Sequence, residues 1–184
     1  GDYRFLNSVT IHDSYPMQII SDIMTKLHGM SYFSKIDLEK AFHQIPVSPE
    51  DIPKTAVITP FGLFEYVMMP FGLRNAAQTF QRYIDQILRN QTNATAYLDD
   101  IIIYSPDQAS HIKHVRSVLK SLSDSNLIIN LRKCEFFKKE VKFLGHLISL
   151  LGVRPIPARL ETISNLILPK TITNLRSFLG TVNF

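Results

Sequence analysis

The most constraining feature of the sequence is an acidic pair placed directly before an apolar run. Asp99 and Asp100 follow Tyr97-Leu98 and precede Ile101-Ile102-Ile103-Tyr104. A short run of β-branched and aromatic residues indicates a buried strand. Asp is common in tight turns because it tolerates unusual backbone angles and bonds nearby backbone groups. The segment 96–104 therefore predicts a hairpin that carries both carboxylates at its turn.

The rest of the chain mixes helical and strand patterns. Helical spacing of apolar residues predicts helices at 18–27, 76–88, 108–123, 158–166 and 173–184. Extended patterns predict strands at 31–38, 127–129 and 141–149, and a hairpin formed by 55–59 and 64–69. The stretch 152–157 contains two prolines and is interpreted as a stiff connector. This mixture indicates an α+β fold rather than a doubly wound parallel sheet.

Composition is that of an ordinary globular chain. Its 184 residues, 45% of them hydrophobic, are enough for one core and a small appended lobe. A net charge of +4 suits a nucleic-acid partner, although many soluble proteins carry such a charge. The single cysteine, Cys134, excludes an intrachain disulfide and is interpreted as a small buried apolar residue. No uninterrupted apolar run is long enough to span a membrane, so we expect no membrane partner.

The acidic pair requires electrostatic compensation. Two adjacent carboxylates repel each other, and a hard divalent cation such as Mg²⁺ or Mn²⁺ would offset that repulsion. Asp37, near the end of the predicted strand 31–38, is the best candidate for a third carboxylate. Such a set could hold two ions that clamp the attacking and leaving oxygens of a phosphoryl transfer. A solvated Asp-Asp turn without chemistry is the alternative, and the pattern alone does not decide between them.

A series of short motifs runs along nearly the whole chain. In chain order they are Asp2-Tyr3-Arg4-Phe5-Leu6-Asn7, Phe33-Ser34-Lys35-Ile36-Asp37-Leu38 with His43-Gln44-Ile45, Asp51-Ile52-Pro53-Lys54-Thr55-Ala56, Met69-Pro70-Phe71-Gly72-Leu73-Arg74-Asn75-Ala76 with Thr79-Phe80, Tyr97-Leu98-Asp99-Asp100, Lys133-Cys134-Glu135-Phe136, Phe143-Leu144-Gly145-His146 and Leu175-Arg176-Ser177-Phe178-Leu179-Gly180. Each is weak alone. In this order and spacing the series resembles the reverse transcriptases of gypsy-type long-terminal-repeat retrotransposons.

The resemblance implies a fold and a domain organisation. The chain would be a fingers and palm fragment of a retrotransposon polyprotein, with an antiparallel palm sheet backed by helices. Fingers and palm would occupy 1–149, with the fingers insertion at about 45–75. Residues 150–184 would begin the thumb or connection region. The protein would be intracellular, either cytoplasmic in a retrotransposon particle or nuclear.

The resemblance also implies an activity and its catalytic residues. The chain would be an RNA-directed DNA polymerase, a nucleotidyltransferase that adds deoxynucleotides to a primer 3′-hydroxyl. Asp37, Asp99 and Asp100 would bind two Mg²⁺ ions, which Mn²⁺ can replace, and the Leu38 carbonyl would add a ligand. Lys133 would protonate the leaving pyrophosphate. A lysine that only steers a phosphate backbone is an equal alternative.

Further residues would contact the substrates. Phe42 would exclude a 2′-hydroxyl by its bulk, although its residue type alone is typical of core packing. The nucleotide pocket would also include Ala41, Phe71 and Gly72. The primer grip, which positions the primer 3′ end, would consist of Phe143, Leu144, Gly145 and His146. The implied partners are a primed RNA or DNA template and deoxynucleoside triphosphates, and the oligomeric state is left open.

Two features depart from the family pattern. Small residues at Asn93-Ala94-Thr95-Ala96 predict a weakly backed acidic hairpin and are compatible with a decayed copy. The basic fingers strand before Gly1 and most of the region after Phe184 lie outside the chain, so the isolated chain is expected to be a poor polymerase. The alternatives are a catalytically dead relic that keeps its fold or its nucleic-acid binding, and a small α+β interaction domain with a solvated Asp-Asp turn.

Overall fold

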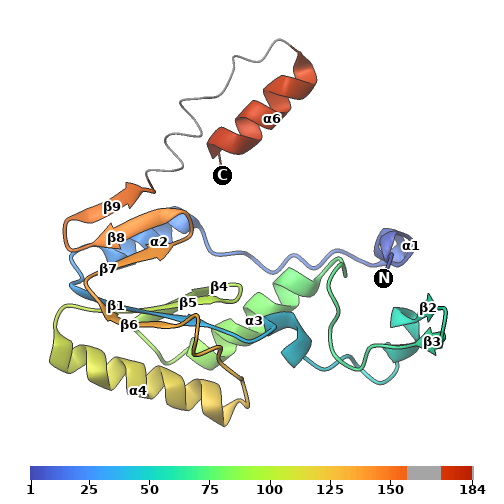
Figure 1. The fold of residues 1–184 in the computed structure, drawn as a ribbon, viewed down its shortest axis with the longest axis horizontal. Helices are drawn as coiled ribbons and strands as arrows, with labels where there is room; N and C mark the ends of the chain where they lie inside the picture. The colour runs from blue at the N-terminus through green and yellow to red at the C-terminus, as the bar shows by residue number, and fades with distance from the viewer. Residues whose placement is uncertain (157–170, 184) are drawn as a thin grey trace.

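The centre of the fold is an antiparallel sheet whose strands come from distant parts of the chain. The computed structural model describes residues 1–156 and 171–183. Within these residues, β4 (Ala94–Tyr97), β5 (Asp100–Ser105), β1 (Tyr32–Asp37) and β6 (Glu135–Lys138) form a four-stranded sheet in the order β4-β5-β1-β6 (Figure 1). Every neighbouring pair is antiparallel. The predicted α+β class with an antiparallel palm sheet is confirmed.

Both faces of this sheet are covered. Helices α3 (Ala76–Leu88) and α4 (Gln108–Asp124) lie on one face, and α2 (Ile20–Leu27) lies on the other (Figure 1). That second face also packs against a smaller sheet of β7 (Glu140–Phe143), β8 (His146–Ser149) and β9 (Gly152–Pro155). Ile101 and Ile103 belong to the core cluster beside α3 and α4, whereas Ile102 belongs to the cluster beside α2. The continuous apolar run therefore reflects a strand buried on both sides.

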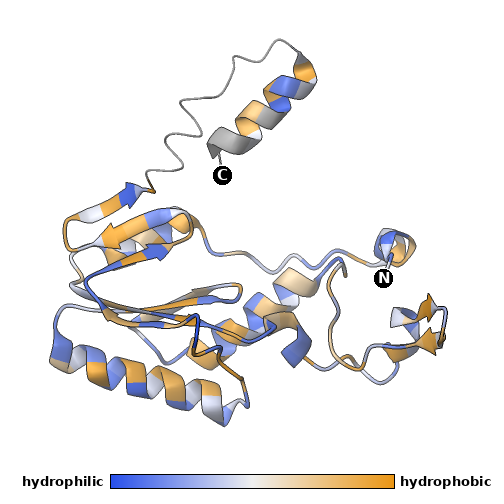
Figure 2. Cartoon of the chain, viewed as in Figure 1, coloured by the Kyte–Doolittle hydropathy of each residue, from blue (hydrophilic) through white to orange (hydrophobic). Residues whose placement is uncertain are grey.

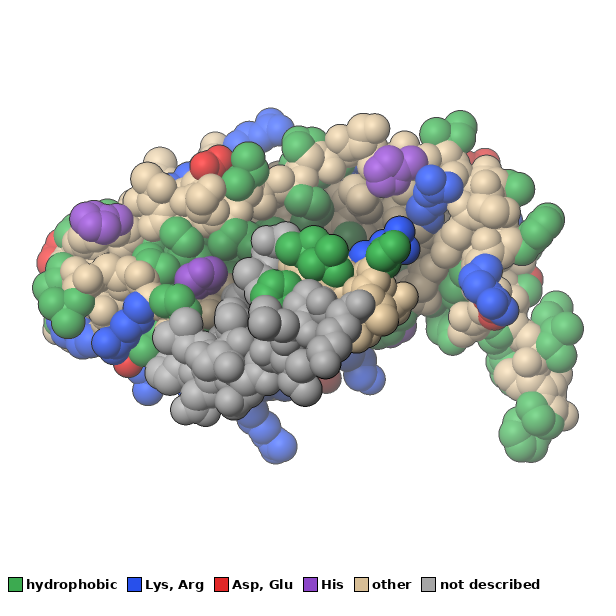
Figure 3. Space-filling model, turned by 90° about the horizontal axis from the view of Figure 1, so that it is seen from above, with side chains coloured by type: hydrophobic (Ala, Val, Ile, Leu, Met, Phe, Trp, Pro, Cys, Tyr) green, Lys and Arg blue, Asp and Glu red, His purple; other side chains and the backbone are tan. Residues whose placement is uncertain are grey.

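The opposite end of the molecule is thinner and more exposed. It contains α1 (Arg4–Val9), the short 3₁₀ helices η1 (Ala41–Gln44) and η2 (Ile52–Thr55), and the hairpin of β2 (Val57–Thr59) and β3 (Gly62–Phe64). Figure 2 colours much of the β2–β3 hairpin as hydrophobic, and Figure 3 shows hydrophobic side chains at this end of the molecule. Ile58 and Phe61 are 89% and 92% exposed. A two-stranded hairpin of this size has little core of its own.

Several predicted elements are confirmed. The helices expected at 76–88 and 108–123 are α3 and α4, and that expected at 18–27 is α2. Asp107 caps α4 by accepting a hydrogen bond from the Ser110 N–H at 2.9 Å, which lowers the pKa of its carboxyl. The helix expected at 173–184 is α6 (Ile172–Asn183), apart from residue 184, which lies outside the described residues, as does the helix expected at 158–166.

Other predictions are wrong. The strand expected at 127–129 is only a single bridge between Ile129 and Leu38. The strand expected at 141–149 is a hairpin, because Leu144 and Gly145 have φ of 46° and 75° and reverse the chain. The supposed connector after residue 151 contains β9, whose Pro155 ends an edge strand. The hairpin expected at 55–59 and 64–69 is shorter, at 57–59 and 62–64.

None of the helices among the described residues combines the length and the apolar character needed to cross a bilayer.

Candidate active site

The acidic hairpin meets β1 at one edge of the central sheet. Tyr97 pairs with Asp100 to close the hairpin, and Leu98 and Asp99 form its two-residue turn. Asp100 also lies directly opposite Asp37 in the β1–β5 register. Directly opposite residues project from the same face of a sheet, so these two carboxyl groups are neighbours. The sequence pattern predicted both acids at the turn. Only Asp99 lies there, because Asp100 is the first residue of β5.

The side chains of this site do not form a closed cluster of acids. Among the described residues, no three Asp, Glu, His or Cys side chains gather closely enough to hold a metal ion. The Asp100 carboxylate instead forms an ion pair with the Lys35 ammonium at 2.8 Å. The donor set still fits a hard divalent ion, because the Asp37 and Asp100 carboxylates are neighbours and Asp99 is next in the chain.

The Leu38 carbonyl lies directly after Asp37 in the chain, and its role as a metal ligand stays a prediction. The Asn130 N–H donates to the Asp37 carbonyl at 2.8 Å, and the Glu39 N–H donates to the Ile128 carbonyl at 3.0 Å. The bridge between Leu38 and Ile129 therefore does not use the Leu38 carbonyl. In an antiparallel pair such a carbonyl points away from its bridge partner, which here means toward β5.

Lys35 is a site residue that was not identified from the sequence. It lies two residues before Asp37 in β1, and alternation along a strand puts both side chains on one face. Its side chain is 21% exposed and that of Asp100 is 31% exposed, so the pair is partly shielded from water. The ammonium offsets part of the repulsion between the two opposite carboxylates. The alternation was visible in the sequence, but the partner of Lys35 was not.

The small residues of β4 are buried and are backed by α3. Ala94, Thr95 and Ala96 are 9%, 4% and 1% exposed. Their size lets α3 come close, and the buried Gln81 amide donates to the Ala96 carbonyl at 3.0 Å. The small residues of this strand therefore leave room for close helix–strand packing.

The segment that carries Lys133 is attached to the backbone of Asp37. Besides the Asn130 contact, the Cys134 sulfur accepts a hydrogen bond from the Asp37 N–H at 3.4 Å. Cys134 is half-buried, and burial raises the pKa of its thiol. Lys133 itself is exposed. Its role as a proton donor stays a prediction.

The residues of the predicted nucleotide pocket include a cluster of aromatic rings that meet edge-on or tilted. Phe42 follows the buried Ala41 in η1, and its ring centroid lies 5.3 Å from that of Phe80 and 5.6 Å from that of Phe71. The His43 ring meets Phe71 edge-on at 4.8 Å. Phe71 is 61% exposed, so it offers a ring face or edge to a ligand. The structure therefore brings Phe42 and Phe71 together.

Gly72 is fixed beside this cluster by the start of the chain. Its φ of 95° is a conformation that favours glycine. The Asn7 side-chain amide donates to the Gly72 carbonyl at 2.7 Å, and its oxygen accepts the Arg74 N–H at 2.8 Å. Asn7 was recognised only as part of a motif, and the structure gives it a supporting function for this loop.

The predicted primer grip is the β7–β8 hairpin. Phe143 is 1% exposed and belongs to the core, whereas Leu144 and Gly145 form the turn. His146 Nδ1 lies 2.8 Å from the Leu144 carbonyl, to which it donates. The turn faces Lys35, Tyr97 and Asp100 across a pocket of about 370 Å³. The hairpin thus lies beside the acidic edge, although the structure does not test its contact with a primer.

Comparison with known proteins identifies the family. The model of the family "Reverse transcriptase (RNA-dependent DNA polymerase)" matches residues 1–148. The chain is 45% identical over 185 aligned residues to the retrovirus-related Pol polyprotein from transposon 297 of Drosophila melanogaster, covering 100% of this chain and 18% of that protein. It is 40% identical over 185 aligned residues to the Tf2-3 transposon polyprotein of Schizosaccharomyces pombe, covering 100% of this chain and 14% of that protein. The chain belongs to the reverse transcriptase family, and the predicted resemblance to retrotransposon reverse transcriptases is confirmed.

Solved structures agree with this assignment. The foamy viral protease-reverse transcriptase dRH in complex with double-stranded DNA has a TM-score of 0.91 at 28% identity, covering 100% of this chain and 32% of that one. The foamy viral protease-reverse transcriptase in complex with an RNA/DNA hybrid has a TM-score of 0.86 at 28% identity, covering 100% and 25%. The predicted reverse-transcriptase fold is therefore confirmed. The boundary between 1–149 and 150–184 stays a prediction.

Proposed function

We propose that this chain supplies the catalytic palm of an RNA-directed DNA polymerase that extends a primer with deoxynucleoside triphosphates. The observation that carries the proposal is the β1–β5 register, which sets Asp37 opposite Asp100 beside the turn that bears Asp99. Membership of the reverse transcriptase family supports it. Structural neighbours bound to double-stranded DNA and to an RNA/DNA hybrid support a primed template as partner.

The chain's own groups would divide the work of the reaction. Asp37, Asp99, Asp100 and the Leu38 carbonyl would hold Mg²⁺ or Mn²⁺, which when bound stabilises charge on the reacting phosphate oxygens. Lys35 would orient the Asp100 carboxylate through its ion pair. Lys133 would donate a proton to the leaving pyrophosphate, and the 143–146 hairpin would position the primer end. The protein would act in the cytoplasm, within a retrotransposon particle, or in the nucleus.

The proposal is tested by primer extension. A polymerase that contains this chain should extend a primer on both RNA and DNA templates in the presence of Mg²⁺, with incorporation that follows the template sequence. The direct readout is the length of the labelled primer on a denaturing gel, with template-free and metal-free reactions as controls. Failure to extend any primed template would contradict the proposed function.

Phe42→Ala is expected to relax discrimination against ribonucleotides. The ring fills the space between Phe71 and Phe80, so its removal opens room for a 2′-hydroxyl. A pocket contact of this size corresponds to roughly 10- to 200-fold in specificity. The measurement is the ratio of kcat/KM for a deoxynucleotide to that for the matching ribonucleotide. Phe42→Tyr keeps the ring and should keep the ratio, whereas an unchanged ratio in Phe42→Ala would contradict the assignment.

A further inference from the structure

The turn that carries Asp99 has a backbone that its own residues do not favour. Leu98 has a φ of 54°, in the left-handed region that bulky side chains rarely adopt. Only two residues, Leu98 and Asp99, separate β4 from β5. Such a conformation persists only when the surroundings hold it in place. The position of the Asp99 carboxylate therefore depends on contacts from outside the hairpin.

Those contacts come from one side chain on α3. Gln81 is fully buried. Its Oε1 accepts the Leu98 N–H at 2.8 Å, and its Nε2 donates to the Ala96 carbonyl at 3.0 Å and to Asp85 Oδ1 at 2.9 Å. The amide thus uses its acceptor and both of its donors, so the turn and the helix fix its orientation. A single side chain bonds the backbone on both sides of Tyr97, directly before Asp99.

Gln81 is in turn held by Asp85, which anchors the crossing segment 13–18. The Tyr15 hydroxyl donates to Asp85 Oδ2 at 2.8 Å, and this hydrogen bond raises the pKa of Tyr15. Gln18 donates to Asp85 Oδ1 at 3.1 Å and accepts from the Thr95 hydroxyl of β4 at 2.8 Å. These bonds connect the segment both to α3 and to the acidic hairpin.

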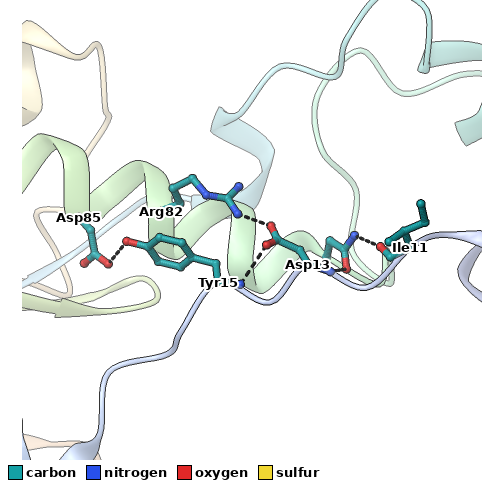
Figure 4. Close-up of polar contacts among 6 residues, drawn as sticks. Ile11, Asp13, Tyr15, Arg82 and Asp85 are labelled. Carbon is teal, nitrogen blue, oxygen red and sulfur yellow. Dashed lines mark hydrogen bonds and ion pairs between the residues drawn. The ribbon is translucent and has the colours of Figure 1, made fainter.

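An ion pair also attaches the crossing segment 13–18 to α3. The Arg82 guanidinium pairs with Asp13 and lies 4.8 Å from the centre of the Tyr15 ring. Figure 4 shows Tyr15 and Asp13 both directed at α3, one toward Asp85 and the other toward Arg82. The crossing segment is therefore attached to α3 at two residues about one helical turn apart, Arg82 and Asp85.

We propose that Gln81 is a positioning residue for the nucleotidyl transfer: it locks the Leu98–Asp99 turn in its strained conformation, and Tyr15 and Asp85 hold Gln81 in the orientation that does so. The inference rests on the proposed function. Gln81 does not touch the substrate. It acts through the backbone of the turn and thereby on the direction of the Asp99 carboxylate.

Gln81→Met tests this with a side chain of similar length that makes none of the three hydrogen bonds. In a polymerase that contains the chain, kcat should fall by about 10- to 100-fold, because a displacement near 1 Å costs that much. The KM for the deoxynucleotide should stay within about twofold, as for a loss confined to the transition state. Gln78→Met is the matched control, since Gln78 lies on the same helix and its buried Oε1 makes no hydrogen bond within the described residues.

A second readout does not depend on activity. Mn²⁺ binding to the chain, followed by electron paramagnetic resonance, should weaken by about 10-fold in Gln81→Met, as when a group that orients a metal ligand is removed, and should not change in Gln78→Met. If the unchanged polymerase fails to extend primers, the proposed function is wrong. The Mn²⁺ titration still tests whether Gln81 positions the acidic turn. Equal Mn²⁺ affinity in Gln81→Met and the unchanged chain would overturn the positioning role.

Tyr15→Phe tests the contact of Tyr15 with Asp85, which lies farthest from Asp99 in this chain of hydrogen bonds. It also provides a test of the proposal if Gln81→Met does not fold. It removes only the hydroxyl bond to Asp85 and should lower kcat by about two- to fivefold with an unchanged KM, a modest share of the effect at Gln81. The two changes together should cost no more than Gln81→Met alone, because both act through the same amide. A kcat for Tyr15→Phe equal to that of the unchanged enzyme, or fully multiplied effects in the double variant, would overturn the proposed relay.

Discussion

Asp99→Asn and Asp37→Asn are each expected to lower nucleotide incorporation at least about a thousandfold, because each removes one negative charge from the proposed metal ligands. Asp100→Asn should cost less, roughly 10- to 100-fold, since Lys35 already neutralises part of the Asp100 charge. The measurement is single-turnover incorporation with Mg²⁺. Asp22→Asn makes the same change on an exposed residue of α2 and should leave the rate unchanged.

The same variants separate loss of catalysis from loss of fold. Asp37 and Asp100 are directly opposite like charges, so Asp37→Asn should raise the free energy of unfolding by roughly 0.2–1 kcal/mol in urea titrations. A variant that is more stable than the unchanged chain and yet inactive has lost its catalytic function while keeping its fold. If Asp37→Asn instead unfolded the chain, its inactivity would say nothing about metal binding.

Mn²⁺ titration distinguishes an enzyme from a dead relic. An active site should bind Mn²⁺ in a way that Asp37→Asn and Asp99→Asn each weaken, whereas Asp22→Asn has no effect. A relic that retains only its fold would show the same weak binding in all of these variants.

The parts of the fold that local patterns encode were predictable from the sequence. Helices α3 and α4 have continuous amphipathic spacing, and the acidic hairpin has a turn between apolar strands. The pairing of Asp37 with Asp100 could not be derived in this way. It depends on register between strands far apart in the chain, and spacing carries no information about which strands pair. The family resemblance supplied that grouping, and the structure supplied the register.

The strand β6 was missed because its periodicity is interrupted. In β6 the register with β1 shifts between Phe33 and Lys35, and Phe137 has a φ of 54°, so strand alternation is broken. Gln81 was missed because a glutamine does not by itself indicate a site. One signal was available: Gln81 precedes Ile84 by three residues and Leu88 by seven, which places a polar residue on the buried stripe of α3.

The broken alternation of β6 serves a buried polar network around His111. The Phe137 N–H donates to Ser34 Oγ at 3.1 Å, and Ser34 Oγ lies 2.7 Å from His111 Nε2. On the other side of the ring, Ser105 Oγ lies 2.8 Å from both His111 Nδ1 and His114 Nδ1. The network connects α4 to β1, β5 and β6, which form the scaffold of the acidic edge.

Protonation of His111 would place a positive charge in this network, where none of the described residues gives it an acidic partner. The ring is fully buried, meets Phe137 edge-on with 5.1 Å between ring centroids, and lies tilted against Tyr32 with 6.2 Å between centroids. The Lys139 ammonium, which lies 3.3 Å from the centre of the Tyr32 ring, is also positive. Burial, together with the His114 charge, lowers the pKa of His111 to about 4.

The chain is therefore expected to lose stability on mild acidification. His111 titrates near 6.5 in the unfolded chain and near 4 in the folded one, so the unfolded state binds the proton first. The contribution of neutral His111 to the free energy of unfolding is therefore complete above pH 6.5. It is lost as the pH falls to 4, by about 3 kcal/mol in all. That is a large share of the roughly 5–15 kcal/mol that stabilises a typical domain. Urea titrations across this pH range measure the loss directly.

His111→Gln isolates this effect, because glutamine does not titrate. The variant should be less stable than the unchanged chain at pH 7, by about 1–3 kcal/mol, since a glutamine cannot satisfy both serines in the same geometry. Its free energy of unfolding should change less between pH 6.5 and 4, so the two curves converge on acidification. His28→Gln, at an exposed position, should keep the full pH dependence. Parallel curves for His111→Gln and the unchanged chain would show that acid sensitivity arises elsewhere.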